Sequence, residues 1–283
     1  MNLIDLHTHT TCSDGTYTPT ELIEYAAQKK LRAIAITDHD TVSALGEAAK
    51  TAENYGIELI PGVEISAIYE GFEIHILGYF IDINHKPLLN FLSDCRNMRH
   101  NRNLEVIRLL CKENIPVTLK EIEALSGGEV IGRAHFAKFL VNNSYCLSVK
   151  EAFANYLLKG QKAYAPRVLP KYEEAIEIIQ LSGGIPVLAH PVKYRLDHEG
   201  GDLMVKALKS RGLMGLEALY SDNTQENEAR YKSMAEKYSL IITGGSDFHG
   251  LNKPGLDLGS GYGSLAIDYS ILDNLKNAKN SMQ

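Results

Sequence analysis

Asp5-Leu6-His7-Thr8-His9-Thr10-Thr11-Cys12-Ser13-Asp14-Gly15 follows a short apolar run early in the chain. His7 and His9 lie two positions apart, and in an extended strand residues i and i+2 point to the same side. Two neutral imidazole rings on one side can bind one metal ion, and Asp14, in the turn that follows, could reach the same ion. A His-x-His pair alone is equally compatible with a half-exposed strand end that binds nothing, so the rest of the chain has to decide.

Four later apolar runs end in residues of types that bind metals. Chance would scatter the ten histidines of the chain over all kinds of element, yet many of them fall at these ends. In an α/β barrel, functional side chains lie at the C-terminal ends of successive strands, around one mouth. The pattern therefore predicts such a barrel. The residues concerned are His39 within Asp38-His39-Asp40, Glu64 after the run from Ile57, His190 after the run from Ile185, Asp247 and His249 after the run from Leu240, and His75 inside the apolar segment 72–79.

The middle of the sequence has a different pattern. Strand and helix signals alternate before and after it, which favours parallel strands with crossover helices, apart from a hairpin at Tyr69-Glu70-Gly71. Between these halves we expect a long helix over 87–113, then short helices that open at the capping boxes Thr118-x-x-Glu121 and Ser148-x-x-Glu151. The expected domains are a discontinuous barrel formed by 1–96 and 166–283, and an all-helical insertion formed by 97–165 over the mouth of the barrel.

As a set, the motifs resemble those of the polymerase-and-histidinol-phosphatase (PHP) family of metal-dependent phosphoesterases. The likeness is nearest to single-chain members that act on nucleotides, of the 3',5'-nucleoside bisphosphate phosphatase and RNase AM type. It rests in part on Gly132-Arg133-Ala134-His135, where such members more often have Pro in place of Ala134. The resemblance implies a distorted (β/α)7 TIM-like barrel. The matching motifs are Asp-Leu-His-Thr-His at 5–9, Ser-Asp-Gly at 13–15, Thr-Asp-His-Asp at 37–40, Gly-Val-Glu at 62–64, Ala-His-Pro at 189–191 and Ser-Asp-Phe-His at 246–249.

The resemblance also implies a centre of two to three divalent metal ions, for which Mn²⁺, Zn²⁺ and Fe are the candidates. Nine ligand candidates are too many for one tetrahedral ion. Glu64 suits a bridge, because a carboxylate can give one oxygen to each of two metals. Glu217, on a further expected strand, receives no role from the resemblance. By resemblance, one ion takes His7, His9, Glu64 and Asp247, a second takes Glu64, His75 and His190, and a third takes Asp14, His39 and His249.

Paired metals activate water and hold both oxygens of an in-line displacement at phosphorus. The expected reaction is therefore attack on a phosphate ester by a metal-bridging hydroxide, with Asp14, His39 and Glu64 as the catalytic residues. His39 is also a candidate proton donor to the leaving alkoxide. Such a reaction needs no serine or cysteine nucleophile, and we interpret Ser13 and Ser246 as turn residues.

Five residues are candidates for contacts with the substrate. By resemblance, Arg133 and His135 at a helix start are the main ones, since arginine and a helix N-terminus both favour phosphate. Arg99 and Arg102, one turn apart on the long helix, either face an anionic ligand or belong to a solvated surface. Arg167 is a weaker candidate.

Composition limits the kind of partner. The formal net charge of −6 argues against tight non-specific binding to long nucleic acid, but permits a nucleotide or the end of a short oligonucleotide. No apolar stretch is long enough for a membrane span, and no signal-peptide pattern is present. The four cysteines are widely spaced, which argues against a disulfide framework or a thiolate zinc site. We expect a cytoplasmic protein with no membrane association and no obligatory protein partner.

The leading hypothesis is a metal-dependent phosphoesterase that acts on a phosphate monoester or terminal phosphodiester of a small nucleotide or short oligonucleotide. Histidinol-phosphate phosphatase is the nearest alternative. An amidohydrolase also begins with His-x-His, but that class often has a bridging lysine where this chain has Glu64. A metal-bound module without activity is the remaining alternative, and a full set of nine ligands argues against it.

Overall fold

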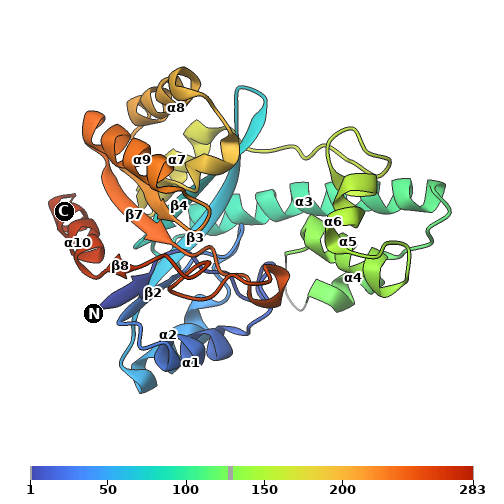
Figure 1. The fold of residues 1–283 in the computed structure, drawn as a ribbon, viewed down its shortest axis with the longest axis horizontal. Coiled ribbons are helices and arrows are strands. Elements are labelled where there is room, and N and C mark those ends of the chain that lie inside the picture. Colours follow the sequence, from blue (N-terminus) through green and yellow to red (C-terminus); the bar gives the residue numbers. More distant parts are fainter. Residues whose placement is uncertain (1, 127–129, 283) are drawn as a thin grey trace.

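The computed structural model describes residues 2–126 and 130–282, and shows an α/β barrel with a helical block attached to one side (Figure 1). Residues 127–129 of the expected insertion lie outside the described residues. Within the described residues, eight strands form one sheet in the order β7-β6-β5-β4-β3-β2-β1-β8. The strands are β1 (Leu3–Asp5), β2 (Ala33–Ile36), β3 (Glu58–Tyr69), β4 (Phe72–Tyr79), β5 (Ile185–Leu188), β6 (Gly215–Tyr220), β7 (Ile241–Gly245) and β8 (Ile267–Asp268).

The sheet curls until β1 and β7 meet, which nearly closes the barrel. The Asp247 amide donates to the His7 carbonyl at 2.8 Å, and the Leu6 amide donates to the Gly244 carbonyl at 3.3 Å. The backbones approach so closely here that a Cβ atom at Gly245 would overlap His7, so this strand end requires glycine. The predicted barrel is confirmed, and its closing seam joins the two strand ends that carry His7 and Asp247.

Not all strands are parallel, however. β3 pairs antiparallel with β4 through the predicted hairpin, and β4 pairs antiparallel with β5. β3 runs without a break through Glu64, so the expectation that Glu64 ends a strand was wrong. β2 already ends at Ile36, yet a further bridge joins His39 to Glu64. Glu64 is therefore level with the mouth because the neighbouring strand β2 stops there, while its own strand continues as the hairpin.

The alternation of side chains along β2 shows how the core is built. Ala33 and Ala35 are buried inside the barrel, whereas Ile34 and Ile36 pack beneath the helices outside it. The two alanines share the interior with larger side chains such as Leu77 and Tyr79, so small and large residues together fill it. The surrounding helices are α1 (Pro19–Gln28), α2 (Leu45–Tyr55), α7 (Tyr172–Leu181), α8 (His198–Ser210), α9 (Gln225–Lys237) and α10 (Ser270–Ser281).

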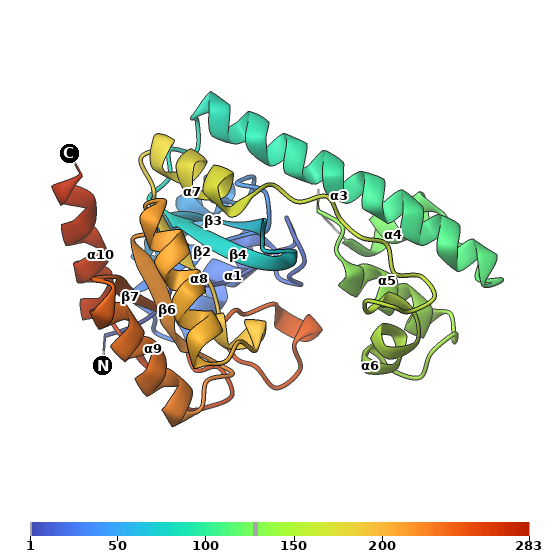
Figure 2. The same cartoon turned by 90° about the horizontal axis from the view of Figure 1, so that it is seen from above.

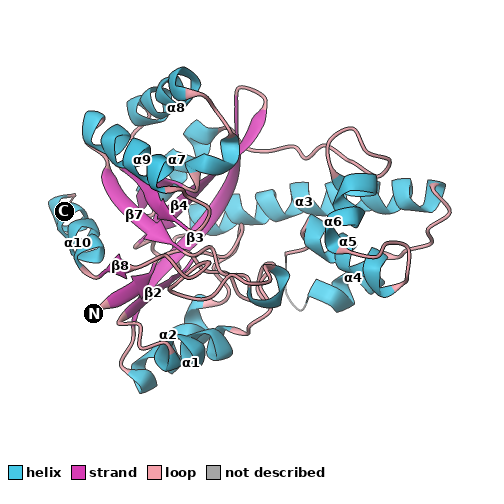
Figure 3. Cartoon of the chain, in the orientation of Figure 1, coloured by secondary structure: helices cyan, strands magenta, loops and turns pink. Residues whose placement is uncertain are grey.

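The described residues of the helical block form helices and loops but no strand, while the strands lie in the barrel (Figure 3). α3 runs from the barrel across to the block (Figure 2), and its bounds match the predicted long helix closely. Leu88 and Leu92 pack into the barrel core, but Val106 and Leu110 pack into a separate core within the block. The expected boundary at 96/97 thus falls inside an unbroken helix. The helices here are α3 (Lys86–Lys112), α4 (Leu119–Ser126), α5 (Arg133–Asn142) and α6 (Val149–Ala152), followed by a π-helical turn at Phe153–Leu157.

None of the described helices is long and apolar enough to cross a membrane.

Candidate metal centre and substrate cavity

All nine predicted ligand candidates come together at the mouth of the barrel. They are brought there by four strand ends, one loop and the two strands of the hairpin. Because the barrel places these elements around one axis, residues far apart in sequence become neighbours. His7 and His9 follow β1, Asp14 lies in the next loop, His39 follows β2, Glu64 and His75 lie within β3 and β4, His190 follows β5, and Asp247 and His249 follow β7.

Glu64 lies at the centre of this cluster. Its Oε1 is 2.8 Å from His75 Nδ1 and 2.9 Å from His190 Nε2. Its Oε2 is 3.0 Å from His39 Nδ1, 3.3 Å from His9 Nε2 and 3.4 Å from His7 Nε2. The two carboxylate oxygens therefore face different histidines, which is the arrangement a bridging ligand requires.

The ligand atoms form four overlapping groups, each compact enough to surround one ion. These groups cut across the three sets implied by the family resemblance, since His39 belongs both with Asp14 and with Glu64. The cluster is thus a continuous array of ligand atoms that can hold metal. The groups are His9, Asp14, His39 and His249; His7, Glu64 and His190; His7, His9 and Asp247; and His39, Glu64 and His75.

The arrangement of His7 and His9 fits a bound cation. His7 Nδ1 lies 2.9 Å from the Glu217 carboxylate, so Nδ1 carries the proton and the lone pair of Nε2 points into the cluster. That Nε2 is 3.1 Å from His9 Nε2. Two facing lone pairs repel unless a proton or a cation lies against them. In metal sites, a ligating histidine almost always donates its other N–H in the way His7 does.

The pKa shifts of His75 and His9 are also consistent with a cation bound in the cluster. Burial opposes protonation of His75, but the carboxylates of Glu64 and Glu73 outweigh it and raise its pKa to about 9. Burial likewise opposes protonation of His9, whose pKa nevertheless rises to about 9 beside Asp247 and Glu64. The buried carboxylates thus attract positive charge strongly, and metal ions compete with protons for the same nitrogens.

Asp247 has contacts on both of its oxygens. Oδ1 faces the histidines, at 3.4 Å from His9 Nε2. Oδ2 accepts hydrogen bonds from Lys193 Nζ at 2.7 Å and the Tyr220 hydroxyl at 2.6 Å, and lies 2.5 Å from Lys253 Nζ. The lysines and the tyrosine hold the carboxylate so that Oδ1 stays directed into the cluster.

Sequence reasoning missed the residues that orient the ligands. Besides His7, Glu217 accepts the His190 amide at 2.7 Å. Asp38 accepts the amide and hydroxyl of Thr10 at 2.7 and 2.6 Å, which holds the loop between His9 and Asp14. A signal for Glu217 did exist, since a lone acidic residue in an apolar strand must find a partner when buried.

Comparison with known proteins agrees with the fold and the cluster. The PHP domain profile matches residues 5–242. The chain belongs to the PHP domain family. It is therefore a metal-dependent phosphoesterase by family, and the predictions of this family and of a phosphoester hydrolase are confirmed.

Several relatives of this PHP protein cover most of its length. It is 36% identical over 249 residues to the 5'-3' exoribonuclease Rnm of Escherichia coli, covering 87% of this chain and 85% of that protein. It is 31% identical over 260 residues to the 3',5'-nucleoside bisphosphate phosphatase of Chromobacterium violaceum, covering 92% and 91%. A solved structure of a putative metal-dependent phosphoesterase from Bifidobacterium adolescentis superposes with a TM-score of 0.86 at 31% identity, covering 96% and 94%.

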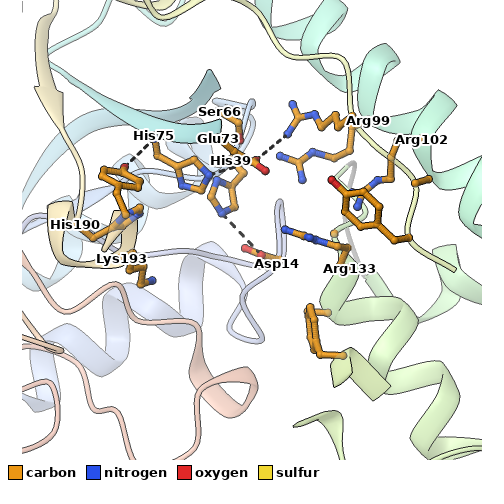
Figure 4. A pocket seen from close by; sticks show the side chains of 17 residues that line it. Asp14, His39, Ser66, Glu73, His75, Arg99, Arg102, Arg133, His190 and Lys193 are labelled. Atoms are coloured by element: carbon orange, nitrogen blue, oxygen red, sulfur yellow. Dashed lines mark hydrogen bonds and ion pairs between the residues drawn. The ribbon is translucent and has the colours of Figure 1, made fainter. Parts of the chain in front are cut away.

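A cavity of about 410 Å³ joins the metal cluster of this PHP protein to the helical block (Figure 4). Its barrel side carries Asp14, His39, His75 and His190, while Arg99, Arg102 and Arg133 come from the block side. Four of the five predicted substrate contacts therefore line one cavity together with metal-ligand candidates. The lining residues are Asp14, His39, Ser66, Glu73, His75, Arg99, Arg102, Gly132, Arg133, Ala134, Phe153, Tyr164, Ala165, Arg167, His190, Lys193 and Tyr194.

His135, the fifth predicted contact, is not among the lining residues. It is buried, and its Nδ1 accepts the Gly132 amide at 3.0 Å. His135 therefore lies buried in the first turn of α5. Its neighbour Arg133 lines the cavity instead.

The arginines differ in how far their charge is balanced. Arg99 and Arg167 each lie 2.7 Å from Asp40 Oδ2, and burial of this carboxyl is outweighed by the two cations, so its pKa falls to about 2. Within residues 2–126 and 130–282, neither Arg102 nor Arg133 has a carboxylate within ion-pair distance. Burial, followed by the charges of the neighbouring arginines, lowers the pKa of Arg102 to about 9.

Proposed function

We propose that this protein hydrolyses a phosphate ester of a small nucleotide or of a short oligonucleotide end, and that the substrate carries a second phosphate besides the one cleaved. A 3',5'-bisphosphonucleoside is the simplest such molecule. The proposal refines the activity shared by the family, and two relatives carry names that agree with it, one a nucleoside bisphosphate phosphatase and one an exoribonuclease.

One observation supports a second phosphate on the substrate. Four arginines, Arg99, Arg102, Arg133 and Arg167, line the cavity, and among the described residues neither Arg102 nor Arg133 has a carboxylate within ion-pair distance. An anion with several acceptor oxygens, such as a phosphate, would pair with these arginines together. The cluster at the other end of the cavity offers a separate place for the phosphate that reacts.

The nine residues of the cluster would hold the ions, with Glu64 positioned to contact more than one. Bound divalent ions would activate water as a nucleophile and polarise the phosphate oxygens. Of the chain's own groups, Lys193 adds positive charge at the cluster end of the cavity, and Arg133 does so at the block end. Asp40 fixes the guanidinium groups of Arg99 and Arg167, so that the substrate meets cations already in place.

The same charges argue against histidinol phosphate. That molecule has one phosphate and a cationic amine, and the amine would face a cavity wall with four arginines. A nucleotide with a second phosphate presents negative charge there.

The test is a hydrolysis screen with Mn²⁺ added. The substrates are adenosine 3',5'-bisphosphate, a short 5'-phosphorylated RNA, histidinol phosphate and a cyclic nucleotide, with release of phosphate or mononucleotide as the readout. We expect the bisphosphate or the RNA to give the highest kcat/KM. A preference for histidinol phosphate, or no hydrolysis of any of them, would overturn the proposal.

A further inference from the structure

The block side of the cavity has a second kind of surface next to its arginines. Phe153 and Tyr164 line it together with Ala134 and Ala165, and both aromatic residues are half-buried. Phe153 lies in the π-helical turn, and Tyr164 lies in the loop that follows it. The fold brings both to one wall of the cavity.

Neither ring is fully explained by packing. Phe153 touches the core of the block with only part of its surface, and Tyr164 belongs to none of the hydrophobic clusters of the described residues. No hydrogen bond of the Tyr164 hydroxyl to another described residue is present to hold that ring in place either. Both rings are only half-buried and line the cavity, so part of each ring is available to a ligand.

The local backbone supports this reading. The Leu158 amide donates to the Phe153 carbonyl at 3.0 Å, an i to i+5 bond that defines a π-helical turn. Turns of this kind are rare and occur often at functional sites. Here the turn lets Leu157 enter the core of the block while Phe153, at its start, borders the cavity.

We infer that Phe153 and Tyr164 form a stacking platform for the nucleobase of the substrate. The inference rests on the proposed function, because it takes the group beside the arginine-bound phosphate to be a nucleotide. Among the described residues that line the cavity there is no Asn or Gln side chain that could read the edge of a base. The platform therefore binds a base through its π face, which all bases share, and favours purines over pyrimidines only through their larger area.

The experiment compares substrates with and without a base. Phe153→Leu and Tyr164→Leu keep apolar volume but remove the rings. Tyr156→Leu is the matched control, because Tyr156 lies in the same π-helical turn, packs against the block core and does not line the cavity. The substrates are adenosine 3',5'-bisphosphate, uridine 3',5'-bisphosphate and the base-free 1-deoxyribose 3,5-bisphosphate, all with Mn²⁺-loaded protein.

We expect each platform variant to raise KM about ten- to a hundredfold for the adenosine substrate, less for the uridine substrate, and not at all for the base-free one. The control variant should leave all three unchanged. Equal losses with and without the base would overturn the platform while leaving the proposed function in place.

A binding measurement separates the two ideas further. Calorimetry on metal-loaded protein compares adenosine 5'-monophosphate with ribose 5-phosphate, and it needs no turnover. Wild-type protein should bind the nucleotide at least about tenfold more tightly, and the platform variants should lose that difference. If the bisphosphates are not hydrolysed but this difference persists, the proposed function fails and the platform stands. Equal binding of both compounds by the wild type would overturn the platform.

Discussion

The two sides of the cavity handle charge in opposite ways. On the barrel side, carboxylates and imidazoles contact one another directly, as around Glu64. On the block side, Arg102 and Arg133 line the cavity, and neither has a carboxylate of a described residue within ion-pair distance. The barrel side therefore suits cations, and the block side suits anions. A chain with a formal charge of −6 thus still has a local group of cations on one wall of its cavity.

The strongest test of the barrel side is Glu64→Gln. The substitution keeps the size of the side chain but removes the charge that five imidazoles surround. We expect turnover of every phosphate ester to fall by about a thousandfold or more, with lower metal content by elemental analysis and an unchanged circular dichroism spectrum. Normal turnover at saturating Mn²⁺ would remove Glu64 from the centre of the site.

Glu217→Gln should have the next largest effect. Glu217 orients His7 and the His190 backbone, and loss of such an outer partner typically lowers metal affinity or activity about ten- to a hundredfold. Competition with a chelator measures the metal affinity. Glu58→Gln is the control, because Glu58 begins β3 and pairs with Lys276 away from the cluster. If both variants weaken metal binding equally, Glu217 has only a general structural role.

Arg133→Ala should affect a substrate with a second phosphate more than one without it. Loss of a charge-assisted hydrogen bond costs about 1.5–3 kcal/mol, so KM for a nucleoside bisphosphate should rise about ten- to a hundredfold. KM and kcat for p-nitrophenyl phosphate should stay the same, because that substrate has no second phosphate. Arg108→Ala, on the exposed face of α3, is the control. A fall in kcat on both substrates would instead place Arg133 at the reacting phosphate.

Leu140→Ala should have the smallest effect on hydrolysis of a simple phosphate ester. Leu140 is fully buried in the core of the block, so its truncation should destabilise the block by about 2–5 kcal/mol. We expect a lower midpoint of thermal unfolding, with metal content and p-nitrophenyl phosphate hydrolysis unchanged. This outcome would support the predicted separation of 97–165 from the barrel, whereas loss of metal would show that the block and the metal centre fold as one unit.

Local features were predictable from the sequence because their causes lie within a few residues. The capping box of Thr118 and Glu121, the hairpin after Tyr69 and the long helix over 87–113 were all expected, and the structure has them. The ligand candidates were also found early, because histidines at the ends of apolar runs form a pattern along the chain.

The tertiary structure alone decided which groups meet. His7 and Glu217 are 210 positions apart, and no local sequence feature of either residue indicates that their side chains meet. Glu64 lies at the mouth because β2 ends beside it. The sequence of β3 alone does not indicate where β2 ends. Asp40 pairs with Arg99 and Arg167, whereas Arg102 has no carboxylate partner among the described residues, and this difference follows from how the elements pack. Sequence periodicity fixes which face of an element is buried, but the charge balance of a site depends on contacts between elements, which the packed fold creates.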